Sequence, residues 1–117
     1  MKFQSEKIKI IKNTKGNIFK ILSKESKLFE RFGEVYISEV KPNKFKGWKL
    51  SDRYTQLLTV IKGSVEFRLK KNSKIRTKTI SFPSNLSILK VPPKTYYCFK
   101  CKNKTTSIVL NITDRVF

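Results

Sequence analysis

The two cysteines of the chain, Cys98 and Cys101, form a "CFKC" motif with the spacing found in zinc sites and redox-active dithiols. A structural zinc ion needs four ligands, and the sequence has no histidine and no further cysteine. A redox-active pair is activated at the start of a helix, whereas this aromatic run is typical of a strand. Residues three apart in a strand face opposite sides, so we expect two reduced structural thiols.

Basic residues dominate the charge of the chain. Lysine and arginine number 27 against 8 acidic residues, which gives a net charge of +19. Such a field favours polyanionic or phosphorylated partners. Arginine is preferred for bidentate contacts with bases and phosphates, yet most of these cations are lysines. A lysine-heavy composition of the kind that AT-rich coding produces explains the charge better than a specialised nucleic-acid surface.

The elements that must position any site are predicted to be strands. Short runs rich in β-branched and aromatic residues alternate with a period of two, and turn residues separate them. These runs cover residues 34–40, 55–61, 64–69, 75–82, 86–91 and 106–112, with weaker strands near 8–11 and 17–22. Only residues 23–32 are predicted to form a helical turn, with Ser23 as its N-cap. A single all-β domain over residues 1–117, a sandwich or barrel, is expected.

No run approaches the roughly 18–20 apolar residues that span a bilayer, and charges interrupt the start, "MKFQSEKIKIIKN". We therefore expect a cytoplasmic protein without membrane insertion.

Three motifs point to a known family. They are "NTKG" at 13–16, "KGWK" at 46–49 and "VPP" at 91–93, set among alternating strands. Nearly the whole chain resembles the RmlC-like cupins that include dTDP-4-dehydrorhamnose 3,5-epimerase and the dTDP-hexose 3,4-ketoisomerases. The resemblance implies a double-stranded β-helix, or jelly-roll, cupin barrel with its ligand in the mouth. It also implies a nucleotide-linked sugar, a dTDP-hexose, as partner and a homodimer.

The chain departs from this family at the positions that carry chemistry. Metal-binding cupins have two histidines, a glutamate and a third histidine where this sequence has Lys49, Ser51, Gln56 and Tyr97. A lysine cation, a hydroxyl and an amide are poor ligands for a transition metal, so the resemblance implies a barrel with no metal and no cofactor. The family's partner tyrosine and histidine-orienting aspartate lie beyond the position of Phe117, so the standard machinery is expected to be incomplete.

Catalysis in the metal-free members implies a role for Lys49. The first histidine of those epimerases is the general base, and Lys49 replaces it, while Tyr97 replaces the second histidine. We expect burial and the nearby Lys46 and Arg53 to favour the neutral amine, although a protonated Lys49 that pairs with a phosphate is an equal alternative. Tyr97 either faces the barrel interior as a catalytic residue or packs in the core.

The remaining candidates are substrate-binding residues. Lys15 and Lys46 stand where the family uses arginine toward the phosphates, and lysine keeps the charge without the bidentate geometry. Arg53 is added to them as a further cation. Gln56 is expected to point inward and either bond a sugar hydroxyl or serve as a structural amide. Trp48 is expected to face away from Lys49, in the core or a dimer interface.

The sequence thus supports a leading function and two alternatives. The leading one is a metal-independent epimerase or ketoisomerase of dTDP-4-keto-hexoses in cell-surface polysaccharide biosynthesis. The first alternative is a non-catalytic cupin that binds a sugar or nucleotide sugar. The less favoured one is a basic nucleic-acid-binding β-barrel, because a single-strand binder concentrates aromatics and cations on one face, whereas the lysines are spread over every turn.

Overall fold

Every regular element of the protein is a β-strand in the computed structural model, which describes residues 3–117. The strands are β1 (Ser5–Lys7), β2 (Lys9–Ile11), β3 (Ile18–Lys20), β4 (Glu34–Val40), β5 (Phe45–Ser51), β6 (Gln56–Lys62), β7 (Ser64–Lys71), β8 (Lys74–Ser81), β9 (Ser87–Val91), β10 (Thr95–Cys101) and β11 (Ser107–Thr113).

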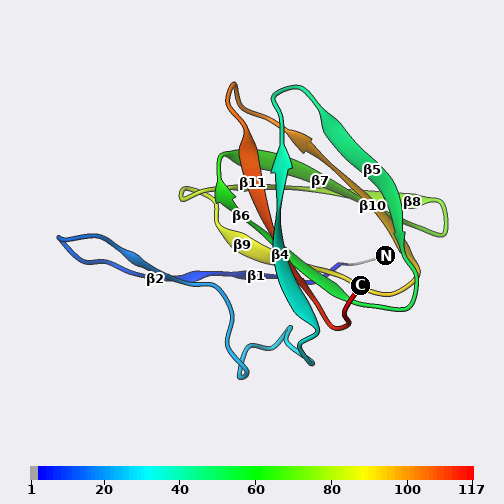
Figure 1. The fold of residues 1–117 in the computed structure, drawn as a ribbon, viewed down its shortest axis with the longest axis horizontal. Helices are drawn as coiled ribbons and strands as arrows, with labels where there is room; N and C mark the ends of the chain where they lie inside the picture. The colour runs from blue at the N-terminus through cyan, green and yellow to red at the C-terminus, as the bar shows by residue number, and fades with distance from the viewer. Residues whose placement is uncertain (1–2) are drawn as a thin grey trace.

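Two antiparallel sheets face one another and form the jelly-roll barrel (Figure 1). One has five strands in the order β1-β9-β6-β11-β4, and the other has four in the order β5-β10-β7-β8. The edge strands β4 and β5 flank one opening of the barrel, and β1 and β8 flank the other. The hairpin of β2 and β3 projects away from the two sheets (Figure 1).

Alternation along the strands builds the core between the sheets. Phe67 and Leu69 of β7, and Leu58 and Val60 of β6, are almost wholly buried, and they belong to one apolar cluster. Burying a side chain of this size contributes about 1.5–3 kcal/mol. The outward residues of the five-stranded sheet form a second, smaller cluster around Leu57 and Ile112, which Leu28 covers.

The strand predictions agree closely with the structure. β4 has the predicted bounds, and the other predicted strands differ by a few residues at their ends. β1, β5 and β10 were absent from the predicted ranges, although the cysteine run within β10 was described as typical of a strand. β5 escapes a search for alternating apolar residues because only Ser51 among its side chains is buried, and lysines and a glycine interrupt its pattern. Its pairing with β10 makes it a strand.

The helical turn predicted for residues 23–32 is wrong. Two separate turns replace it, in which the amides of Ser26 and Phe29 donate to the carbonyl oxygens of Ser23 and Ser26. The Ser23 hydroxyl accepts from the Glu25 amide at 3.1 Å, and the Ser26 hydroxyl accepts from the Ser23 amide at 2.9 Å. Such local bonds compete with helix formation. No helix suited to crossing a membrane occurs among residues 3–117.

Candidate functional site at the barrel mouth

Lys49 and Tyr97 are direct neighbours across β5 and β10. Residues opposite each other in an antiparallel pair project to the same face. Tyr97 belongs to the core cluster and is only 4% exposed, so this face is the interior of the barrel. Lys49 is exposed because β5 is the edge strand beside the opening, so the burial that was expected for this lysine is wrong. The structure therefore brings the two predicted catalytic residues together at the rim of the barrel.

Gln56 joins this pair from the opposite sheet. Its side-chain amide donates to the Tyr97 hydroxyl at 2.6 Å, and its side chain is fully buried. The side-chain carbonyl oxygen of Gln56, Oε1, is buried without a hydrogen-bond partner. An unsatisfied buried acceptor costs about 1–3 kcal/mol, and a ligand hydroxyl would relieve that cost. The inward orientation expected for Gln56 is what the structure shows.

The Tyr97 hydroxyl is protonated at neutral pH. Its pKa is raised to about 12, because burial and, to a smaller extent, Tyr54 and Tyr36 raise it by more than the bond from Gln56 lowers it. A phenol with this pKa is neutral at pH 7. Tyr97 is therefore suited to donate a hydrogen bond, and it is not suited to act as a base.

Four polar residues of this region were missed by the sequence analysis. Tyr36 and Ser38 of β4 share the inward face, and the Asn111 amide of β11 donates to the Ser38 hydroxyl at 3.1 Å. Burial, Tyr54 and Glu34 raise the pKa of Tyr36. Tyr36 and Ser38 are an even number of residues from the buried Val40, and Asn111 is two residues from the buried Val109, so alternation would have predicted that all three point inward. Tyr54 lies in the loop after β5, where alternation predicts nothing. We use "barrel mouth" for the site formed by Tyr36, Ser38, Lys49, Tyr54, Gln56, Tyr97 and Asn111.

Lys46 lines a cavity next to the barrel mouth. It pairs with the inward-facing Phe99 across β5 and β10. The cavity has a volume of about 660 Å³ and lies between β4 and β5. Its lining is Ile37, Ser38, Glu39, Val40, Lys41, Lys44, Lys46 and Ile108. Three lysines around one opening favour an anion such as a phosphate.

The other two predicted substrate-binding residues lie apart from this cavity. Arg53 is exposed in the loop between β5 and β6. Lys15 lies in the turn of the projecting β2–β3 hairpin, where its amide donates to the Asn13 side chain at 2.8 Å. Figure 1 shows that hairpin on the far side of the molecule from β5. Within one chain, Lys15 is therefore not part of the barrel mouth.

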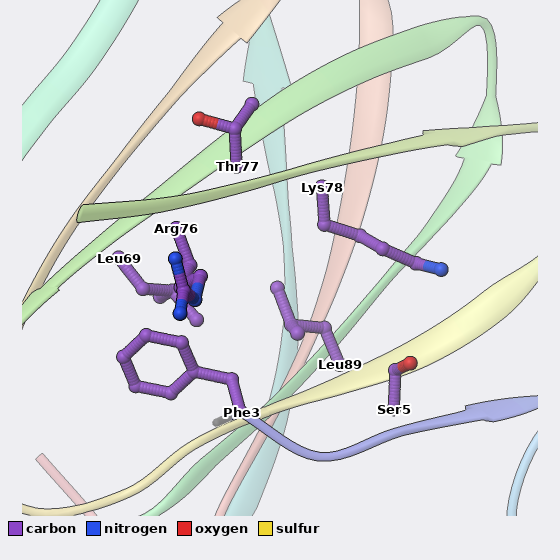
Figure 2. Close-up of a pocket in the computed structure, with 7 residues that line it drawn as sticks. All are labelled: Phe3, Ser5, Leu69, Arg76, Thr77, Lys78 and Leu89. Atoms are coloured by element: carbon purple, nitrogen blue, oxygen red, sulfur yellow. The ribbon is translucent and has the colours of Figure 1, made fainter. Parts of the chain in front are cut away.

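A different cavity lies at the opposite opening (Figure 2). It measures about 390 Å³ and is lined by Phe3, Ser5, Leu69, Arg76, Thr77, Lys78 and Leu89. Arg76 and Lys78 of the edge strand β8 pair with the buried Leu69 and Phe67, so they are on the inward face. Inward-pointing charges on an edge strand hinder pairing with another chain, which accounts for these two cations.

Both cysteines are free and buried, as expected. Cys101 belongs to the core cluster, whereas Cys98 lies on the outer side of the same strand, where burial raises the pKa of its thiol. Within residues 3–117, no group of three or more histidine, cysteine or acidic side chains is placed to hold a metal ion.

The fold and the inward-facing mouth define the protein as an RmlC-like cupin. No protein-family model matches the chain, and no curated protein matches it. Among solved structures, a dTDP sugar isomerase from Desulfovibrio desulfuricans G20 is 31% identical over 97% of this chain and 76% of its own, with a TM-score of 0.89. The chain belongs to this dTDP-sugar isomerase family.

Two more distant structures share the fold. The sugar 3,4-ketoisomerase QdtA from Thermoanaerobacterium thermosaccharolyticum, in complex with TDP, is 21% identical over 98% of this chain and 82% of its own, with a TM-score of 0.83. A variant of it with one histidine replaced by asparagine was crystallised with TDP-4-keto-6-deoxyglucose. The dTDP-4-dehydrorhamnose 3,5-epimerase from Elizabethkingia anophelis NUHP1 is 16% identical over 97% of this chain and 69% of its own, with a TM-score of 0.79.

Proposed function

We propose that the protein is a cytoplasmic epimerase or ketoisomerase of dTDP-4-keto-hexoses that serves cell-surface polysaccharide biosynthesis. The observation that carries this proposal is the pairing of Lys49 with Tyr97 on the inward face of the barrel. Family membership supports a nucleotide sugar as the substrate class, and the pairing places an amine beside a hydrogen-bond donor. Proton transfer next to a ketone needs both groups.

In the proposed reaction, neutral Lys49 removes the proton from the carbon next to the sugar ketone. The electrons of that C–H bond form the enolate, and the Tyr97 hydroxyl donates a hydrogen bond to the oxygen that gains charge. Protonation of the same carbon from the opposite face by a water molecule at the open mouth, with Lys49 giving its proton to solvent, gives the epimer. For the ketoisomer, Lys49 returns its proton to the former carbonyl carbon, while the hydroxyl proton on the carbon that lost its hydrogen moves to the former carbonyl oxygen, so that the ketone moves by one carbon.

Substrate binding is assigned to the cations and the amide around the mouth. Lys46, with Lys41 and Lys44 beside it, attracts the diphosphate into the cavity between β4 and β5. Gln56, from the opposite sheet, holds the Tyr97 hydroxyl by a 2.6 Å hydrogen bond. QdtA was crystallised with TDP, and its variant with a TDP-linked keto sugar, which supports a nucleotide sugar as ligand.

Deuterium exchange tests the role of Lys49. Incubation of a dTDP-4-keto-6-deoxyhexose with the protein in heavy water should introduce deuterium next to the carbonyl, detected by mass spectrometry. Lys49→Met should reduce the exchange rate by about a hundred- to ten-thousand-fold, which is the usual contribution of a general base. Lys9→Met, which removes an exposed lysine from the projecting hairpin, should leave the rate unchanged. Undiminished exchange in Lys49→Met would remove Lys49 from the mechanism.

The second candidate function is a non-catalytic binder of the same nucleotide sugars. Its supporting observation is the exposure of Lys49, because a lysine that acts as a base is ordinarily desolvated. A ligand at a hundred times its dissociation constant stabilises the folded state by about 2.7 kcal/mol, so a thermal shift reports binding independently of turnover. A shift with dTDP-hexose and no exchange with any 4-keto substrate would establish this second function.

We also propose that the protein acts as a homodimer. Lys15 lies on a hairpin that points away from its own barrel mouth (Figure 1). A second copy is the arrangement in which this lysine reaches the phosphates of a bound nucleotide. The outer face of the five-stranded sheet exposes Val35 and Ile37, and apolar residues of this kind favour an interface.

A further inference from the structure

Exposed aromatic side chains gather on the outer face of the four-stranded sheet. Phe45, Trp48 and Tyr96 are 62%, 43% and 46% exposed. Tyr96 alternates with the buried Tyr97, and Phe45 pairs with Lys100, next to the buried Phe99. Trp48 lines the same outer pocket as Phe45 and Cys98. Large aromatic side chains exposed side by side on a sheet are available for stacking.

Cations accompany these aromatics row by row. Each row runs from β5 through β10 to β7. The first row is Phe45, Lys100 and Glu66, the second is Gly47 with the adjacent Trp48, Cys98 and Arg68, and the third is Leu50, Tyr96 and Lys70. Successive rows are two residues apart along the strand, or about 6.7 Å. We use "outer aromatic face" for Phe45, Trp48, Arg68, Lys70, Tyr96 and Lys100.

A pocket of about 270 Å³ lies within this face. Phe45 and Trp48 form its apolar side, and Arg68, Lys100 and Cys98 line it with Glu66. Glu66 holds the Arg68 guanidinium by a 2.9 Å ion pair, which orients the arginine beside the aromatic rings. A planar group between the rings would therefore have a cation at its edge.

We propose that the outer aromatic face binds single-stranded nucleic acid. Bases stack on Phe45, Trp48 and Tyr96, and Lys70 and Lys100 neutralise the phosphates between them, while Arg68, whose charge Glu66 balances, lies beside the rings. A second copy of the chain fits less well, because a two-fold contact would bring these cations against each other. An acidic polysaccharide has the charge but lacks the flat π-systems that three aromatic side chains would match.

The fold brings together features of a nucleic-acid surface that are separate in the sequence. In the sequence the lysines are spread over every turn, and the aromatics of this face come from separate segments around residues 45–48 and 96. Pairing of β5 with β10 and of β10 with β7 brings those aromatics and three cations together. The net charge of +19 adds long-range attraction for a polyanion.

Trp48 provides a direct test because it is the only tryptophan of the chain. Single-stranded oligodeoxyadenylate of about 12 nucleotides, within the usual site size, is titrated into the full protein while Trp48 fluorescence is recorded. Adenine avoids the thymidine that the barrel mouth would recognise. Fluorescence should be quenched on binding, and the affinity should fall as salt is raised.

Matched variants separate the outer aromatic face from general charge attraction. Phe45→Ala should weaken binding about tenfold, whereas Phe32→Ala, which removes an exposed aromatic outside the sheets, should not change it. Lys100→Gln should weaken binding more than Lys9→Gln, although both remove one exposed charge. Thermal melting checks that each variant is folded.

Several outcomes would overturn the proposal. Equal effects within both variant pairs would show that bulk charge alone attracts the oligonucleotide. Tighter binding of polygalacturonate would show that the ligand of the outer aromatic face is an acidic polysaccharide. Self-association of the protein that competes with the oligonucleotide would show that a second copy of the chain covers this face. Displacement of the oligonucleotide by dTDP would place it in the barrel mouth. Because Lys49→Met should leave oligonucleotide binding intact, failure here is distinguishable from failure of the proposed sugar chemistry.

Discussion

Tyr97 illustrates how burial tunes a single residue, since its hydroxyl has a pKa of about 12 against an ordinary value near 10. Below pH 10 both the folded and the unfolded chain keep this proton. Between pH 10 and 12 the unfolded chain releases it and the folded chain does not, so the free energy of unfolding falls as pH rises. The contribution lost is on the order of 2–3 kcal/mol.

Tyr97→Phe should remove this part of the pH dependence. Urea unfolding between pH 9 and about 11.5, followed by Trp48 fluorescence, should show a shallower decline in the variant than in the parent protein. The variant should also lose about 1 kcal/mol at neutral pH, because the Gln56 amide loses its acceptor. Parallel curves for the two proteins above pH 10 would contradict the assigned pKa.

At the scale of the element, the pairing of β5 with β10 requires a glycine at position 47. The register opposite β10 slips at this point, so Tyr97 faces Lys49 and Cys98 faces Gly47, with Trp48 as an extra residue. Gly47 has φ of +120°, and a Cβ there would lie 2.6 Å from the Cys98 Cβ and 2.7 Å from the Tyr97 carbonyl oxygen. The bulge thus turns Lys49 inward and Trp48 outward.

Gly47→Ala should therefore destabilise the fold by roughly 2–5 kcal/mol, from backbone strain and from overpacking. Gly16→Ala is the matched control, because Gly16 has φ of +132° but no atom within 4 Å of an added Cβ. Urea unfolding of both variants measures the difference. Equal losses would show that close packing against Cys98 contributes nothing at Gly47.

At the scale of the whole molecule, the proposed homodimer uses the outer face of the five-stranded sheet. Val35 and Ile37 of β4 are exposed there, and they pair with Ile112 and Leu110 of β11. Ile37→Asp should convert a dimer into a monomer, measured by light scattering after gel filtration. Ile75→Asp, which changes an equally exposed residue on β8 of the other sheet, should remain dimeric. A wild-type monomer at micromolar concentration would contradict the proposal.

Much of the fold and part of the site could be predicted because alternation is a local property. A period of two identifies a strand and the side to which each residue points, so β4 has its predicted bounds and Gln56 and Tyr97 face inward. The same period would have placed Tyr36 and Ser38 inside. The opposite sides of Cys98 and Cys101 follow from it as well.

Only the tertiary structure decided which strands lie beside each other, because pairing joins residues that are distant along the chain. The pairing of β5 with β10 places Lys49 opposite Tyr97 and Phe45 opposite Lys100. It leaves Trp48 on the surface, outside the core, and the projecting hairpin takes Lys15 away from the mouth of its own chain (Figure 1). The sequence by itself thus determined what each strand presents on its two faces, and the closing of the barrel decided which of those faces meet.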